Sequence, residues 1–283
     1  MQWLERWNEA MEYLEGHLTK ELDREQLARI ACCSEYHFQR MFSYIAGVTL
    51  AEYIRRRKMT LAACDLQQGD KVTEVAMRYG YESPTAFNRA FQAVHGLPPS
   101  AAHKPGVRLK AYARIIFQLS VKGVEQMEYR LETREGFRIV GFRQLIQPDL
   151  EDNFAQTPLF WDKVAQSGRL GEVLSLADGK VPGLLGVSSC DLEAPNYYYI
   201  AVSSSADVPE GMHEFTVPAC DWAIFTGHGK MPEAIQELEC RIVTEWLPSS
   251  GYEWGKAPDL EVYLNDDPQD SSFEVWLPIT KRK

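Results

Sequence analysis

The sequence has no run of about 18 consecutive apolar residues, the length that a membrane-spanning helix requires. At the N-terminus, Glu5, Arg6 and Glu9 interrupt the segment in which a signal peptide would need an unbroken apolar core. Both absences argue against membrane insertion and export. We therefore expect a cytoplasmic protein without a membrane partner.

The six cysteines include no Cys-x-x-Cys pair, so a frequent signature of zinc and redox sites is missing. Cys32, Cys33 and His37 come closest to a metal site. Adjacent cysteines project in different directions, however, and no distant pair has the spacing of zinc ligands. We predict buried free thiols, no metal and no cofactor.

Basic residues are scarce in the second part of the chain. The 283 residues carry 30 Lys+Arg and 40 Asp+Glu, a net charge of −10. Residues 1–125 hold 17 basic and 14 acidic residues (+3), whereas residues 126–283 hold 13 and 26 (−13). This asymmetry predicts two domains with different partners, of which the acidic one suits neutral or cationic ligands.

A pattern S-x-x-x-F-x-R-x-F-x-x-x-x-G occurs twice, displaced by 49 residues. A serine before a helix is a good N-cap, and a glycine commonly ends one. Each copy therefore predicts the second helix of a helix-turn-helix unit. The first copy consists of Ser34, Phe38, Arg40, Phe42 and Gly47, and the second of Ser83, Phe87, Arg89, Phe91 and Gly96.

Each of these helices has one apolar and one polar face. Apolar residues recur at the i, i+3, i+4, i+7 spacing of a buried stripe, as in Phe38, Met41, Phe42 and Ile45. The polar face offers long hydrogen-bonding side chains of the kind that a DNA major groove requires. The outward-facing residues are Tyr36, Gln39, Arg40 and Ser43 in the first copy, and Pro84, Thr85, Asn88 and Arg89 in the second.

Between the copies, residues 51–67 have a helical pattern that contains a block of four basic residues. A stiff helix here would hold both recognition helices on one face of double-stranded DNA, in two adjacent major grooves about 34 Å apart. A basic block is by itself often only a solvated face. We expect part of it to contact phosphates, and the candidates are Arg55, Arg56, Arg57 and Lys58.

The segments SEYHFQRMF, YIRRRKM and VTEVAMRYGYESPTAFNRAFQAVHGLPPS resemble the DNA-binding domain of the AraC/XylS transcription regulators, over roughly residues 3–106. The resemblance implies an all-α domain at residues 1–106 with two helix-turn-helix units joined by a linker helix. Pro84 departs from a position that is often polar in the family, which removes one potential base contact. The implied base contacts are Tyr36, Gln39 and Arg40, followed by Thr85, Asn88 and Arg89.

Beyond the prolines at 98, 99 and 105, strand and helix patterns follow one another to the end of the chain. Residues 113–123 and 127–135 read as two strands joined by a turn around Gly123. The order strand, helix, strand, strand then appears twice, which predicts a duplicated α+β domain with an antiparallel sheet at residues 107–283.

Alternation along three of these strands separates core positions from a second face. It places Glu261 with Tyr263 opposite the apolar residues, and likewise Glu274 with Trp276. In the strand at 197–203 it sets Tyr199 apart from its neighbours. An aromatic cleft with an acid at its base is the resulting expectation.

Residues 111–283 resemble the gyrase-inhibitor-like (GyrI-like) effector-binding domain. The resemblance implies a small-molecule effector, often a bulky aromatic cation, held in a cleft between the two halves with Glu261 as counter-charge. Glu274 is the alternative acid. The implied aromatic walls are Tyr263, Trp222, Tyr199, Trp254 and Trp276.

Together these features predict a DNA-binding transcriptional regulator, an activator that recruits RNA polymerase, under control of a small-molecule effector. One alternative is a GyrI-like hydrolase or sequestering protein for DNA-damaging toxins, in which the glutamate would activate water. The absence of a Ser-His-Asp arrangement disfavours an enzyme. Another alternative is a DNA-binding protein whose second domain docks a protein partner.

Overall fold

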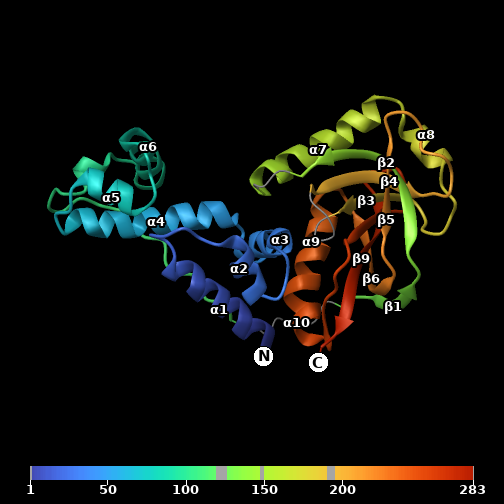
Figure 1. Ribbon diagram of the computed structural model, residues 1–283, viewed down its shortest axis with the longest axis horizontal. Coiled ribbons are helices and arrows are strands. Elements are labelled where there is room, and N and C mark those ends of the chain that lie inside the picture. The colour runs from blue at the N-terminus through green and yellow to red at the C-terminus, as the bar shows by residue number, and fades with distance from the viewer. Residues whose placement is uncertain (1, 119–125, 147–149, 190–194, 283) are drawn as a thin grey trace. The chain divides into compact units, whose positions relative to one another are not determined.

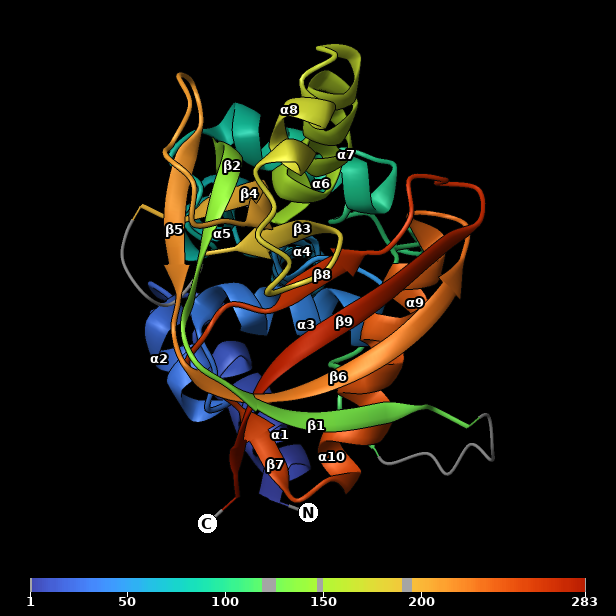
Figure 2. The same ribbon diagram turned by 90° about the vertical axis from the view of Figure 1, so that its right-hand side faces the viewer.

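The computed structural model describes residues 2–118, 126–146, 150–189 and 195–282. The chain divides into two compact units, residues 1–120 and residues 121–283, and each unit is described on its own (Figures 1 and 2). Within the described ranges, no helix combines the length and the apolar character that a membrane span needs.

The helical unit begins with the first helix-turn-helix. Ser34 caps its second helix by accepting a hydrogen bond from the His37 backbone N–H, and Gly47 ends the helix in the left-handed conformation with φ of 67°. Of the predicted stripe, Phe38, Met41 and Phe42 are buried and Ile45 is half-buried. The helices are α1 (Gln2–Gly16), α2 (Arg24–Ile30) and α3 (Glu35–Ala46).

The second helix-turn-helix repeats this design. Ser83 accepts from the Ala86 backbone N–H, and Gly96 ends the helix with φ of 76°. The linker helix α4 packs against both helices of this second unit, whose core is separate from that of the first. Figure 1 shows the two helix-turn-helix units at opposite ends of α4. The elements are α4 (Leu50–Gln67), α5 (Val72–Arg78), α6 (Pro84–His95) and the short 3-10 helix η1 (Pro99–Ala101).

Residues 107–118 differ from the prediction. No strand forms over residues 113–118; instead, residues 107–117 run as an extended strap across the helical unit. Its backbone bonds to side chains of helices α1, α4 and α6 instead of to a neighbouring strand. The strap therefore packs with the DNA-binding helices, although the prediction assigned it to the second domain. The turn expected at Gly123 lies outside the described residues.

The second unit is the predicted α+β domain. Helix α7 begins earlier than expected, so that Pro158 lies inside it, and the short elements α8 and β7 were not predicted. The strands and helices, in chain order, are β1 (Tyr129–Arg134), β2 (Phe137–Leu145), α7 (Leu150–Gln166), α8 (Leu170–Ser175), β3 (Leu184–Ser188), β4 (Tyr197–Ser203), β5 (His213–Val217), β6 (Cys220–Gly229), α9 (Glu233–Arg241), the π-helical turn η2 (Ile242–Trp246), α10 (Leu247–Ser249), β7 (Tyr252–Trp254), β8 (Leu260–Tyr263) and β9 (Ser271–Lys281).

The strands form one antiparallel sheet in the order β1-β6-β9-β8-β3-β4-β2-β5, with β7 paired to β9. The order confirms two similar halves. β2, α7, β3 and β4 of one half correspond to β6, α9, β8 and β9 of the other, and the halves join where β3 pairs with β8. At this seam Gly186 lies opposite Glu261.

The two faces of the sheet carry different cores. One core combines Ile139, Val217 and Ile224, from strands near both ends of the sheet, so the sheet folds onto itself on this face. The other core contains Ile200 and lies under α7, which contributes Val164. Because neighbouring residues of a strand point to opposite faces, this division decides which side chains can share a site.

Candidate nucleic-acid interface and effector site

The polar residues of α3 bond along their own helix. Gln39 donates to the Glu35 carboxylate at 3.1 Å, and Arg40 Nε donates to the Tyr44 hydroxyl at 3.2 Å. Tyr36 is half-buried, while Gln39 and Arg40 are only 8% and 6% exposed. Gln39 and Arg40 each bond a residue one turn away on α3, and their contact with DNA stays a prediction.

The matching face of α6 is open. Thr85 and Arg89 are exposed and Asn88 is half-buried, all three within the first turns that follow Ser83. Pro84 occupies the first helical turn, where its missing N–H costs no hydrogen bond. This helix presents its polar side chains as a groove-reading helix must.

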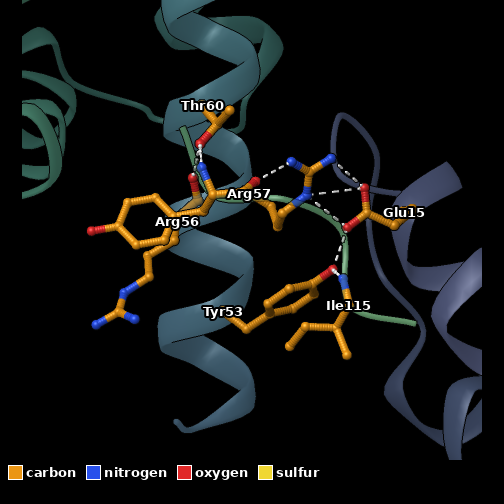
Figure 3. A network of polar contacts seen from close by, with 7 residues as sticks. Glu15, Tyr53, Arg56, Arg57, Thr60 and Ile115 are labelled. Atoms are coloured by element: carbon orange, nitrogen blue, oxygen red, sulfur yellow. Dashed lines mark hydrogen bonds and ion pairs between the residues drawn. The ribbon is translucent and has the colours of Figure 1, made fainter. Parts of the chain in front are cut away.

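The basic block of α4 is divided between structure and surface. Arg57 donates to both oxygens of the Glu15 carboxylate, with its Nη2 2.8 Å from Oε2, and both side chains are only 12% exposed (Figure 3). Lys58 donates to the Tyr79 carbonyl at 3.1 Å, and burial lowers the pKa of its ammonium group. The prediction of phosphate contact is wrong for Arg57, because its guanidinium bonds inside the unit. Lys58 is half-buried, and its contact with phosphate stays a prediction.

Arg55 and Arg56 keep part of their surface. Both pair with Glu52 one turn earlier on α4, and their side chains are 48% and 32% exposed. The Arg56 guanidinium also lies 5.0 Å from the ring centre of Tyr112. Two of the four predicted phosphate candidates are thus available at the surface.

In the second unit, Glu261 is the centre of a polar and aromatic group that we call the Glu261 cluster, formed with Tyr198, Tyr263 and Trp161. The Tyr198 and Tyr263 hydroxyls donate to Glu261 Oε2 at 2.8 and 3.0 Å. Trp161, from α7, donates its indole N–H to the Tyr198 hydroxyl at 3.0 Å and packs edge-on against Tyr263. The cluster thus gathers α7, β4 and β8 at the seam of the two halves.

The close contact between Tyr198 and Glu261 depends on a protonated phenol and on a glycine. Burial, followed by the nearby Glu261 charge, raises the pKa of Tyr198 well above its ordinary value, so this phenol stays a proton donor. Gly186 makes the close approach feasible, because a Cβ there would come within 2.3 Å of the Tyr198 hydroxyl oxygen and 2.6 Å of Glu261 Oε2.

Four of the five predicted aromatic walls lie elsewhere. Tyr199, Trp222 and Trp276 are at most 2% exposed and belong to the core on the opposite face of the sheet from Glu261. Trp254 lies on β7, opposite Ile279 and away from the seam. The structure therefore brings only Tyr263 together with Glu261, because β-strand alternation sends the other side chains to the opposite face or to a different strand pair.

Sequence reasoning missed Tyr198 and Trp161. Alternation did place Tyr198 opposite Tyr199, but it read the Tyr198 face as apolar core. Trp161 was part of the predicted helix, yet nothing in the sequence indicates which strand that helix covers. Register across β4, β3 and β8 was the missing information.

Glu274 has a different role from the one considered. Its carboxylate accepts from both Nη atoms of Arg130, at 2.8 and 3.1 Å, and from the indole N–H of Trp276 at 2.7 Å. The side chain is 9% exposed. An internal ion pair therefore already neutralises this acid, which removes it as an alternative to Glu261.

Two family profiles match the chain. Residues 27–104 match a helix-turn-helix domain, and residues 130–279, more than half of the chain, match the integron-associated effector binding protein family. These are families of DNA-binding and effector-binding proteins, which supports sensing over the enzymatic alternative.

The relatives match either nearly the whole chain or only a part of it. The transcriptional regulator Rob of Salmonella typhimurium is 33% identical over 95% of this chain and 96% of its own. The activator AarP of Providencia stuartii is 36% identical over 33% of this chain and 70% of its own. The solved structure of SAV2435 bound to tetraphenylphosphonium covers 54% of this chain and 94% of its own, at 21% identity and a TM-score of 0.48. The chain belongs to the AraC-type helix-turn-helix transcriptional regulators that carry a GyrI-like effector-binding domain, and it is a ligand-controlled DNA-binding regulator.

Proposed function

We propose that this regulator reads two adjacent major grooves with α3 and α6, and that an aromatic cation bound beside Glu261 controls this reading. The observation that carries the proposal is the carboxylate of Glu261, held between two tyrosine hydroxyls at the seam of a duplicated effector domain. We assign the DNA-binding role to the helices of residues 1–106 and the effector role to the sheet domain that follows the strap.

Base reading by α6 rests on its exposed polar face. Arg89 is the residue suited to guanine, because its planar guanidinium can bond O6 and N7 together, and Asn88 is suited to adenine. Thr85 would contact either base edge or phosphate. On α3, Tyr36, Gln39 and Arg40 take the corresponding role once Gln39 and Arg40 exchange their bonds to Glu35 and Tyr44 for bonds to DNA.

Replacing Arg89 with alanine is expected to cost about 1–3 kcal/mol at one base pair of the site and little on random DNA. Arg55→Ala is the comparison, because Arg55 is a candidate phosphate contact. It should weaken all sequences alike and reduce the salt slope of binding by about 1. Arg57→Ala should leave the slope unchanged, since its guanidinium bonds to Glu15.

The measurement is fluorescence anisotropy on a site selected from random DNA, at several salt concentrations. Equal losses of Arg89→Ala on the selected site and on random DNA would contradict the assignment of Arg89 to base reading. A salt slope that stays unchanged in Arg55→Ala would remove Arg55 from the phosphate contacts.

The effector class follows from the chemistry of the Glu261 cluster. A partly buried carboxylate attracts a cation more strongly than one in water does, because the effective dielectric constant is lower. Trp161 and Tyr263 add aromatic faces that attract a cation by about 0.5–2 kcal/mol per ring. A bulky aromatic cation can use both interactions, and an anion of the same shape would be repelled.

Rhodamine 6G and fluorescein test this assignment, because they share a xanthene ring system and differ in charge. We expect rhodamine 6G to bind the full chain and Glu261→Gln to weaken this binding about tenfold, which corresponds to the loss of about 1.4 kcal/mol of Coulomb attraction. Fluorescein should not compete. Glu210→Gln, which removes the same charge from an exposed position, should leave the affinity unchanged.

Anisotropy of the dye gives both affinities. Equal affinity of the wild-type protein and Glu261→Gln for rhodamine 6G would sink the assignment of Glu261. Competition by fluorescein at the same concentration would show a site selected by shape and not by charge.

The DNA-binding role also bears on where the protein acts and how it regulates transcription. A protein that regulates transcription acts where the chromosome is, so we place it in the cytoplasm. Activation through contact with RNA polymerase is the mode we propose, in keeping with the activator AarP among the relatives.

A further inference from the structure

The strap, residues 107–117, is held along its length by side chains of the DNA-binding helices. From its N-terminal end, the Lys110 N–H donates to His95 Nδ1 of α6 at 3.2 Å, and the Tyr112 N–H donates to Thr60 of α4 at 3.1 Å. Farther along, the Ile115 N–H donates to the hydroxyl of Tyr53, also on α4, at 3.2 Å. One extended segment is thereby bonded to α6, to the middle of the linker helix and to the N-terminal part of that helix.

The last part of the strap reaches α1. Asn8 bonds both backbone groups of Phe117, accepting from its N–H at 2.9 Å and donating to its carbonyl at 3.0 Å. The buried Phe117 ring packs edge-on against Trp7 of α1 and Phe42 of α3. The strap therefore contacts the first helix-turn-helix at one end and α6 of the second at the other.

The central anchor is the network of Glu15, Tyr53 and Arg57 (Figure 3). Tyr53 donates to Glu15 at 2.6 Å while accepting from the strap, and Arg57 bonds Glu15 and also donates to the Tyr112 carbonyl. Tyr53 and Arg57 thus each bond both Glu15 of α1 and the strap. The strap is therefore attached to the two side chains that join α1 to α4.

At the other end of the strap, the hydrogen bonds of His95 require one protonation state of its ring. The strap N–H of Lys110 needs an acceptor at Nδ1, so the ring proton lies on Nε2, which donates to the Met59 carbonyl at 3.0 Å. Burial lowers the pKa of His95, and the Lys110 charge acts in the same direction, so the ring stays neutral. The contact between the Lys110 N–H and His95 is therefore a hydrogen bond between uncharged groups, and DNA phosphates do not compete for it.

We propose that the strap is a splint that fixes the two helix-turn-helix units in the relative orientation for simultaneous binding, and that the effector acts on DNA binding by changing how the strap docks. The chain after the strap leads directly into the effector unit, so the splint is the covalent path between the two functions. This second step rests on the proposed function, whereas the splint itself does not.

Two conservative variants of the full chain test the splint. Thr60→Val removes the acceptor of the Tyr112 N–H, and Tyr53→Phe removes the acceptor of the Ile115 N–H. Tyr79→Phe is the matched control: Tyr79 also donates its hydroxyl to a carboxylate, that of Asp65 at 3.0 Å, but no strap bond depends on it. All three variants leave the predicted DNA contacts untouched.

Affinity is measured on a selected two-box DNA site, in which each box is the sequence read by one helix-turn-helix unit. The comparison is the same site with one box replaced by random sequence. Rigid linkage raises the effective concentration of the second unit at its groove, so the strap variants should lose about tenfold on the two-box site and less than about twofold on the single box. Tyr79→Phe should change both sites by the same factor. Equal losses of the strap variants on both sites would overturn the splint.

Hydrogen exchange of the strap tests the link to the effector. At saturating rhodamine 6G, verified by anisotropy, the amides of residues 107–117 should exchange several-fold faster or slower than in the free protein. Unchanged exchange at saturation would refute the effector link. A dye that fails to bind would instead refute the proposed effector class, and the two-box comparison would still decide the splint.

Discussion

Replacing Arg57 with alanine should lower the free energy of unfolding of the helical unit by about 3 kcal/mol. The substitution leaves the Glu15 carboxylate partly buried without its cation, and removing one partner of such a pair typically costs about 3–5 kcal/mol. The 12% exposure of both side chains favours the lower end of that range. Arg57 also donates to the strap, so the loss affects three segments at once.

The measurement is urea denaturation followed by far-UV circular dichroism, with Arg29→Ala as the control. Arg29 forms an exposed ion pair with Asp23 at 3.9 Å, and surface pairs of this kind contribute about 0–1 kcal/mol. A loss for Arg57→Ala no larger than that for Arg29→Ala would contradict the structural role of Arg57.

Acid should reduce this difference. Burial alone would raise the pKa of Glu15, but the hydrogen bonds from Arg57 and Tyr53 outweigh it and leave the pKa lowered from 4.5. A lowered pKa in the folded state stabilises the fold above the unfolded value, and that contribution is lost as the pH falls through the folded value. The gap between wild type and Arg57→Ala should therefore be full at neutral pH and shrink below about pH 4.5.

The outcome for Arg57 shows where sequence reasoning stops. Four consecutive basic residues on a helix point in four directions, so they cannot all face one phosphate backbone. The sequence shows the block but not the partner, because Glu15 lies in another helix and meets Arg57 only after folding. Arg55 keeps the predicted exposure because its partner, Glu52, is one turn away on the same helix.

Local signals explain what was predicted well. Ser34 and Ser83 act as N-caps, and Gly47 and Gly96 end their helices, because capping depends on a few neighbouring residues. The strands of the sheet were predicted for the same reason, because the alternation of side chains is also a pattern of neighbouring residues. The Glu261 cluster depends instead on register across β4, β3 and β8, so the sequence predicted Glu261 and Tyr263 and missed Tyr198 and Trp161.

Replacing Gly186 with alanine should displace the side chains of Tyr198 and Glu261 in the Glu261 cluster. The new methyl group would lie 2.3 Å from the Tyr198 hydroxyl oxygen and 2.6 Å from Glu261 Oε2, closer than atoms can approach. Both side chains must shift, and such overpacking typically costs about 1–3 kcal/mol of stability. Because the carboxylate moves as well, rhodamine 6G should bind about tenfold more weakly, as in Glu261→Gln.

A double-mutant cycle separates this clash from a general effect of alanine in a strand. Tyr198→Phe removes the atom nearest to the new methyl group, so Gly186→Ala should cost less in the Tyr198→Phe background, with a coupling of about 1 kcal/mol. Gly171→Ala, at a position in α8 where a Cβ would meet nothing within 4 Å, should be neutral or slightly stabilising. An identical cost of Gly186→Ala in both backgrounds would mean that the glycine does not act through the Tyr198 hydroxyl. A coupling of the expected size would establish that a bare backbone at the seam lets the tyrosine and the carboxylate meet.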